Sequence, residues 1–184
     1  MLTELSIDIE TLSTKPNALV LSIGMCWFSK DYPATVSRDV EKDSLIDLPI
    51  IHPDLNQPGS HIDADTVQWW MRQSSEAKQV FSERIDREPL SYAVISIMEA
   101  VNNATHIWAK DPDFDCVILS HFLQSYSHDG FDWPFWKNRS VRTKLDDVPS
   151  AKNLPFEGVQ HNALADAVHQ ARQIQACYAS IRNK

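Results

Sequence analysis

Two carboxylates stand two positions apart in the segment LSIDIETL, which otherwise has the pattern of a β-strand. Strands disfavour aspartate and glutamate, because these side chains pack poorly on a pleated, half-buried surface. Residues two apart in a strand point to the same side, so Asp8 and Glu10 project together while Leu5, Ile7 and Ile9 face the core. Carboxylates rooted roughly 7 Å apart can converge on a hard cation such as Mg²⁺. The pair indicates a metal site, and its alternative is the solvated face of an edge strand.

A second acidic cluster, DPDFDC, contributes Asp115. It stands between the end of an expected strand and the start of an expected helix, where α/β sheets place functional groups. An aspartate at the start of a helix also serves as a cap or a partner of the helix dipole, and that alternative stays open.

The segment HNALADA separates His161 from Asp166 by five residues. Asn162 is a good N-cap, so we expect His161 in the loop before a helix and Asp166 in the second turn of that helix. A histidine over such a site suits a general base, because imidazole titrates near neutrality. A lone histidine can equally be an ordinary surface residue.

The surrounding pattern predicts an α/β fold with a mixed central sheet flanked by helices. We expect strands at 5–9, 18–28, 35–40 and 105–109, the first two as a hairpin, and a loop or ordered insertion at 45–62. Expected helices begin at Asp63 or Asp65 (through TVQWWMRQ), at Ser74 or Ser75 (through EAKQVFSERI), and over 90–101 and 115–126. A last, long helix is predicted to bury one face, formed by Leu164, Val168, Ala171, Ile174, Tyr178 and Ile181.

Composition limits the class of protein. The 184 residues, 43% of them hydrophobic, fit a single domain over 1–184, and the net charge of −8 argues against a broad basic face for nucleic acid or membrane. None of the four glycines lies in a GxGxxG or GxxxxGK context, which argues against the two nucleotide-binding classes that use those loops. The three cysteines lack CxxC spacing and are expected to be buried. No long apolar run or leader pattern is present, so we expect a cytoplasmic protein without a membrane partner.

Aromatic and basic side chains add candidates for nucleic-acid contacts. Trp69 and Trp70 are adjacent on an expected helix, about 100° apart, so at most one of them faces the core squarely. Trp69 and Phe114 are candidates for stacking on bases, with core or dimer packing as the alternative. The segment KNRSVRTK is a candidate for upstream phosphate contacts, with a solvated charge run as the alternative; its basic residues are Lys137, Arg139, Arg142 and Lys144.

The segments DIET, FDCVIL and HNALAD together resemble the three exonuclease motifs of the DEDD superfamily, and the H-x-x-x-x-D spacing resembles its DEDDh branch. More narrowly, DIETLSTKPNALVLSIG, TVQWWMRQSSEA, WAKDPDFDCVIL and RSVRT resemble the group of phage exonuclease A and the mycobacterial RNase T-like exoribonucleases. The similarity runs in order from about residue 4 to residue 175. Four motifs in the correct order are far more specific than any one of them.

This resemblance implies an RNase H-like fold, with an insertion around residues 45–90 relative to compact members. It implies that Asp8, Glu10, Asp115 and Asp166 bind two Mg²⁺ or Mn²⁺ ions and that His161 is the general base. By the same resemblance, Thr11 and Leu12 line the pocket of the 3′-terminal nucleotide.

The implied activity is 3′-5′ exonucleolytic hydrolysis of RNA or DNA, which releases nucleoside 5′-monophosphates by a two-metal mechanism. The implied setting is the cytoplasm of a bacterial or phage-infected cell, with a homodimer as a further expectation. The alternatives are an RNase H-like endonuclease, which does not need His161 at this spacing, and a catalytically silent nucleic-acid-binding module.

Overall fold

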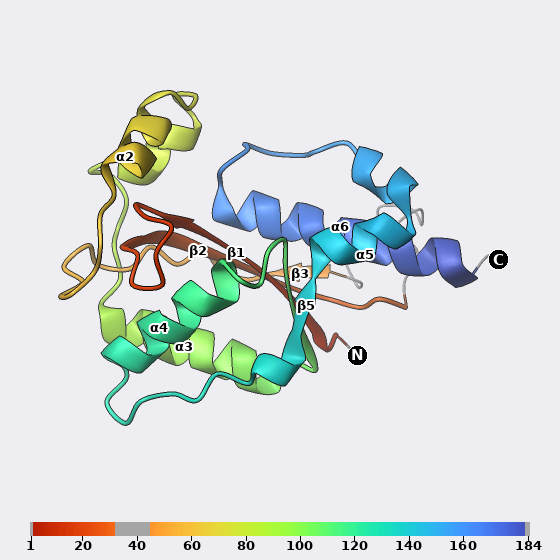
Figure 1. Cartoon of the computed structure of the whole chain (residues 1–184), viewed down its shortest axis with the longest axis horizontal. Helices are drawn as coiled ribbons and strands as arrows, with labels where there is room; N and C mark the ends of the chain where they lie inside the picture. Colours follow the sequence, from red (N-terminus) through yellow and green to blue (C-terminus); the bar gives the residue numbers. More distant parts are fainter. Residues whose placement is uncertain (1, 32–44, 183–184) are drawn as a thin grey trace.

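A five-stranded mixed sheet forms the centre of the molecule (Figure 1), in a computed structural model that describes residues 2–31 and 45–182. The strands follow the order β3-β2-β1-β4-β5. β1 pairs antiparallel with β2 and parallel with β4. The strand bounds are Glu4–Thr11 (β1), Val20–Phe28 (β2), Leu45–Asp47 (β3), His106–Ala109 (β4) and Asn138–Ser140 (β5). The predicted α/β class with a mixed sheet is confirmed.

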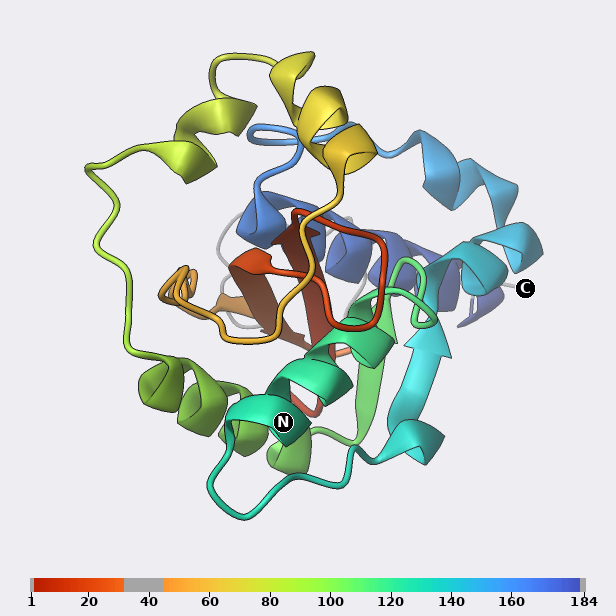
Figure 2. The same cartoon turned by 60° about the vertical axis from the view of Figure 1, so that its left-hand side comes forward.

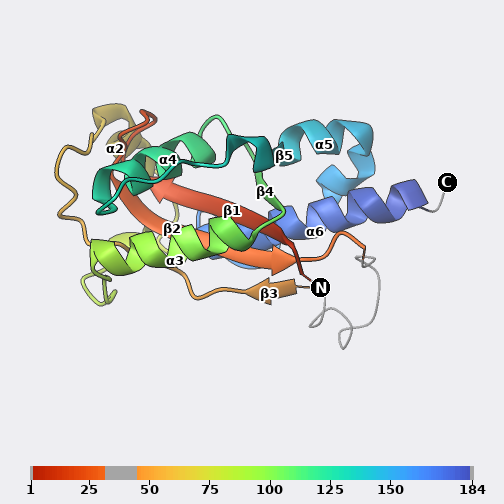
Figure 3. The same cartoon turned by 90° about the horizontal axis from the view of Figure 1, so that it is seen from below.

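Helices cover both faces of the sheet, as Figures 1 and 3 show from two sides. α3 (Leu90–Asn103) and α4 (Asp115–Tyr126) pack with the odd-numbered apolar residues of β1, namely Leu5, Ile7 and Ile9. α5 (Val141–Asp147) and α6 (Ala163–Arg182) enclose a second core on the other face. The alternation in β1 therefore sends its even-numbered side chains, including Asp8, toward α6.

α6 lies unusually close to the sheet at Gly24, the residue of β2 that pairs with Asp8. A Cβ atom on Gly24 would lie only 2.1 Å from the backbone carbon of Ala163. Because Gly24 has no side chain, the first turn of α6 can rest on β2 at the level of Asp8. The absence of a side chain at position 24 therefore helps to bring Asp166 to β1.

The face that α6 buries differs from the predicted one. Ala171 and Ile174 are buried as expected, but Leu164, Val168 and Tyr178 are only half-buried and Ile181 is exposed. Near the close approach to β2 the buried residues are the small Ala163 and Ala167, whereas larger side chains such as Ile174 are buried farther along the helix. Asp166 also lies in the first turn of the helix, not the second. The buried residues of α6 are Ala163, Ala167, Gln170, Ala171, Gln173, Ile174, Gln175 and Cys177.

The described part of the segment between β2 and α3 departs from the predictions in two places. The strand predicted at 35–40 lies outside the described residues, while residues 45–47, expected in a loop, form the edge strand β3. α2 (Ala64–Met71) begins at Asp63 as predicted, and the Asp63 carboxylate accepts a hydrogen bond from the Thr66 N–H. The helix predicted over EAKQVFSERI is only a 3₁₀ turn, Ala77–Phe81, because two buried apolar residues three apart support one such turn.

The remaining predicted elements agree with the structure. α3 and α4 occupy 90–103 and 115–126, and the short strand THIWA contains β4. The three cysteines are buried and free. No helix in residues 2–31 and 45–182 has the length and hydrophobicity required to cross a bilayer.

Candidate nuclease active site

Three predicted acids converge at one end of the sheet. Asp8 and Glu10 project from β1, and Asp166 from the first turn of α6. One carboxylate oxygen from each residue lies within 4.8 Å of one from each of the other two. A trio of oxygen ligands at this spacing can be bridged by a single hard cation.

Asp115, the fourth predicted acid, reaches the same region from the start of α4 and lies outside that trio. β4 pairs with β1 only as far as Ser6, so Ile9 lies beyond the paired part of β1 on that side. The Ile9 N–H donates to Asp115 Oδ1 over 3.3 Å. This bond holds the start of α4 against the acid-bearing part of β1.

The electrostatics of the four acids are those of repelling carboxylates in a buried site. Burial, together with the charges of Asp115, Glu10 and Asp166, raises the pKa of Asp8 well above its usual range. Burial and the charges of Asp166 and Asp115 raise the pKa of Glu10 to about 8. Burial raises the pKa of Asp115 to about 7, although backbone hydrogen bonds oppose it. Such a cluster gains most from a cation placed among its oxygens.

His161 lies in the loop before α6, as predicted, and has a left-handed backbone with φ of 63°. The backbone N–H of His161 donates to Asp166 Oδ2 over 2.8 Å. As the N-cap of α6, Asn162 accepts through Oδ1 from the Ala165 backbone N–H. The His161 ring packs edge-on against Trp69, with ring centroids 4.8 Å apart. Figure 2 shows α2, which carries Trp69, beside the loop that precedes α6.

A cavity of about 600 Å³, here called the aromatic pocket, opens beside these acids. Trp69, 39% exposed, lies on its wall, whereas Trp70 is buried and donates from Nε1 to the Thr11 carbonyl. Leu12, predicted to line the pocket of the 3′-terminal nucleotide, is not among the residues that line the aromatic pocket, and it packs against the cluster of Leu19 and Trp70. The pocket is lined by Ile9, Glu10, Thr11, Thr14, Asp63, Asp65, Thr66, Trp69, Trp70, Phe114 and His161.

A second cavity, of about 550 Å³ and here called the basic pocket, lies on the other side of His161. Of the four basic residues in the segment KNRSVRTK, only Arg142 lines the basic pocket. Lys137 and Arg139 donate to backbone carbonyls, and Lys144 pairs with Asp147. The basic pocket also contains Lys110, Lys152, His161, Asp166, His169 and Gln170.

Gln170 and Lys110 are side chains near the acids that the sequence analysis did not single out. Gln170 is buried one turn after Asp166 in α6 and donates from Nε2 to Asp8 Oδ1 over 2.8 Å. The (i, i+4) spacing from Asp166 is the sequence signal that could have pointed to Gln170.

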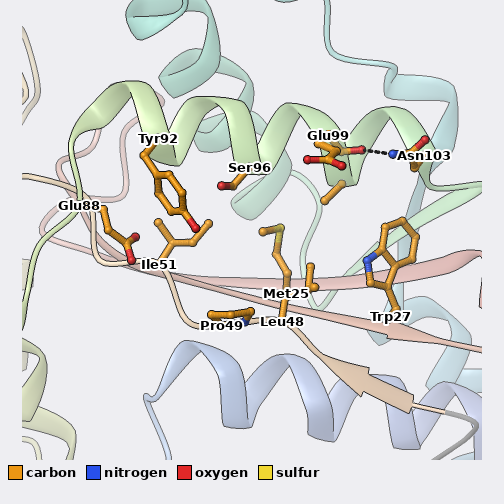
Figure 4. A pocket seen from close by; sticks show the side chains of 11 residues that line it. Met25, Trp27, Leu48, Pro49, Ile51, Glu88, Tyr92, Ser96, Glu99 and Asn103 are labelled. Atoms are coloured by element: carbon orange, nitrogen blue, oxygen red, sulfur yellow. Dashed lines mark hydrogen bonds between the residues drawn. The ribbon is translucent and has the colours of Figure 1, made fainter.

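Another cavity, of about 300 Å³, lies between α3 and the β2 edge and contains none of the predicted site residues (Figure 4). Its floor is apolar, with Met25 and Trp27, and Glu88 and Tyr92 lie at one end. Because the acids and His161 lie elsewhere, this cavity is not the candidate active site.

The five-stranded mixed sheet with helices on both faces is an RNase H-like nuclease fold. Residues 3–178 match the model of the 3′-5′ exoribonuclease Rv2179c-like domain, and the chain belongs to that family. A solved structure of S. pombe Pop2p, in its Mg²⁺ and Mn²⁺ bound form, has a similar fold with a TM-score of 0.59 and 9% identity. That match covers all of this chain and 84% of the Pop2p chain. Among curated proteins, none matches this sequence.

Proposed function

We propose that this protein is a divalent-metal-dependent 3′-5′ exonuclease that removes nucleoside 5′-monophosphates from the 3′ end of RNA. The observation that carries the proposal is the convergence of Asp8, Glu10 and Asp166 within 4.8 Å beside His161. RNA is the first choice of substrate because the family is one of exoribonucleases.

The donor set fits Mg²⁺ or Mn²⁺. Its ligands are carboxylate oxygens, which hard divalent cations prefer, and the mutual repulsion of buried carboxylates is relieved by positive charge. In the proposal Asp8, Glu10, Asp115 and Asp166 hold two such ions. Bound there, the ions would supply the Lewis acidity and positive charge that phosphodiester hydrolysis requires.

His161 is proposed as the general base that takes a proton from the attacking water. The backbone N–H of His161 donates to Asp166, and its ring packs against Trp69. The imidazole is therefore held where the two pockets meet. Histidine suits this role because its ordinary pKa lies close to neutral pH.

The two pockets differ in charge, and this difference supports cleavage at an end. The described residues that line the aromatic pocket include Asp63, Asp65 and Glu10 and neither lysine nor arginine, so this pocket suits an uncharged terminal nucleoside stacked on Trp69 or Phe114. The basic pocket suits the phosphates of the preceding nucleotides, which Lys110, Arg142 and Lys152 can contact. In this arrangement the 45–90 insertion supplies Trp69 through α2.

The proposal is tested with matched 5′-labelled RNA and DNA oligomers, incubated with Mg²⁺, Mn²⁺ or EDTA and resolved over time. We expect shortening by one nucleotide at a time from the first time points, faster on RNA, and no reaction in EDTA or with Asp8→Asn. Internal cuts ahead of terminal ones would indicate the endonuclease alternative. Binding without cleavage under any metal would indicate the silent module.

A further inference from the structure

Gln170 lies one turn after Asp166 in α6 and reaches Asp8 on β1. It is 3% exposed, and its Nε2 donates to Asp8 Oδ1 over 2.8 Å. Asp166 lies four residues earlier, so both side chains emerge on the same side of α6. The bond therefore crosses from the helix to the central strand within the acid cluster.

The orientation of the Gln170 amide is the one that suits an ionised Asp8 carboxylate. Its other polar atom, Oε1, is buried and has no hydrogen-bond partner among the described residues. A buried acceptor without a partner is costly, and turning the amide over would place that oxygen against the Asp8 carboxylate instead. The amide therefore donates to Asp8 through Nε2, while its Oε1 stays without a hydrogen-bond partner among the described residues.

An amide also suits this position better than a cationic side chain. A lysine or arginine here would pair with Asp8 and neutralise the charge that attracts a divalent cation. The amide donates one hydrogen bond and leaves the carboxylate with its full negative charge and its second oxygen free of this bond. Partners of this kind orient metal ligands in many proteins.

We propose that Gln170 is a positioning residue that holds the Asp8 carboxylate in the orientation needed to bind the metal ion. This inference rests on the proposed function, because it assigns a role toward the cation proposed there. Gln170 does not contact the ion or the substrate in this proposal and acts through Asp8.

The test is the affinity for Mn²⁺, measured by titration calorimetry on the metal-free protein without nucleic acid. Gln170→Leu keeps the size of the side chain and removes the donor, and we expect it to weaken Mn²⁺ binding about 10- to 100-fold. Gln173→Leu is the matched control: Gln173 is a buried glutamine of the same helix and the same pocket. We expect Gln173→Leu to stay within about threefold of the wild-type affinity, well below the loss caused by removing an oriented partner.

Enzyme kinetics separate positioning from structural support. In Gln170→Leu the Mn²⁺ concentration for half-maximal activity should rise by the same factor as the dissociation constant, while KM for RNA stays unchanged. If Gln170→Leu does not fold, Gln170→Asn provides a second variant, because its shorter amide withdraws the donor from Asp8 yet remains polar. Wild-type Mn²⁺ affinity in the folded variant would overturn the proposal. An absence of Mn²⁺ binding to the wild-type protein would instead contradict the proposed function itself.

Discussion

Two glutamates of β1 show how surroundings decide the use of a buried carboxylate. Glu4 accepts from Trp108 Nε1 over 2.6 Å and pairs with His106 and Lys30. Burial alone would raise its pKa, but these hydrogen bonds and charges hold the pKa of Glu4 below its ordinary value. Glu10 lies on the same strand among other acids, and burial together with their charges raises its pKa. The carboxylate of Glu4 is thus satisfied by the protein, while that of Glu10 is proposed to bind a cation.

The Glu4 network predicts the response to acid. Because the folded-state pKa of Glu4 is lowered, its ionised form stabilises the protein above the ordinary value of 4.5, and this contribution is lost as the pH falls below 4.5. Glu4→Gln should lower the free energy of unfolding at pH 7 by about 2 kcal/mol. The difference should shrink toward pH 3, as urea unfolding at several pH values will show. An equal difference at pH 7 and pH 3 would contradict this role for the Glu4 charge.

The proposed role of His161 as general base predicts that its substitution slows turnover and leaves metal binding unchanged. Its left-handed backbone makes Asn the better substitution, since Asn tolerates this conformation while Ala is strained there. His161→Asn should lower kcat about 10²- to 10⁴-fold, because the general base is lost. Mn²⁺ affinity, measured by calorimetry, should remain close to that of the wild type. Unchanged turnover would contradict the role of His161 as a base.

The position of Trp69 in the aromatic pocket predicts that its substitution selectively weakens substrate binding. Stacking on one base contributes about 1–3 kcal/mol, so Trp69→Leu should raise KM for a single-stranded oligomer roughly 5- to 150-fold. Trp136 is the matched control, because it is more exposed, at 66%, and lies outside the aromatic pocket. Steady-state kinetics on one labelled RNA will compare the two variants. Equal effects of both substitutions would count against a base-stacking role for Trp69.

At the scale of elements, the docking of α6 on β2 is what assembles the site. Gly24→Ala would place a methyl group against the main chain of Ala163, and we expect a loss of stability of about 1–3 kcal/mol or more together with loss of activity. Because the clash is with backbone atoms, Ala163→Gly should not rescue the variant. Thermal unfolding and exonuclease assays of the single and double variants test this, and rescue by Ala163→Gly would show that side chains cause the conflict.

The elements that the sequence predicted well are those whose pattern is local. Alternation in β1, helical spacing in α3 and the Asp63 cap of α2 each depend on a few neighbouring residues. The contact face of α6 was wrong, because it is chosen by the distance to Gly24 on another element. The 3₁₀ turn at Ala77–Phe81 was also missed. Its short length reflects that only Ala77 and Val80 in it are buried, and this burial depends on other parts of the chain.

The same distinction holds for the site. Motif spacing singled out Asp8, Glu10, Asp115, Asp166 and His161, and the structure brings all five to one end of the sheet; their catalytic roles stay predictions. The (i, i+4) spacing from Asp166 could have placed Gln170 near the acids, but it could not have shown the contact with Asp8, which joins positions 162 residues apart. Leu12 shows the reverse case, a residue next to a motif whose side chain turns into another cluster.

At the scale of the whole molecule, the repelling acids predict a response to metal removal. A cation that binds the folded state and not the unfolded chain stabilises the protein by mass action. Mn²⁺ at about 100 times its dissociation constant should therefore add about 2.7 kcal/mol to the free energy of unfolding. Thermal melts in EDTA and in Mn²⁺ will measure this. Asp8→Asn should show little of the increase, and an equal increase in that variant would place the cation elsewhere.

The distance along the chain between β1 and α6 also has a consequence during synthesis. The acids of β1 leave the ribosome early, whereas His161, Asp166 and Gln170 follow only after some 150 further residues. A nascent chain that has not yet released these residues contains at most three of the four acids proposed to bind metal, and it lacks the proposed base. If the proposed function is right, the nascent chain acquires activity only after the first turns of α6 have emerged and docked on Gly24.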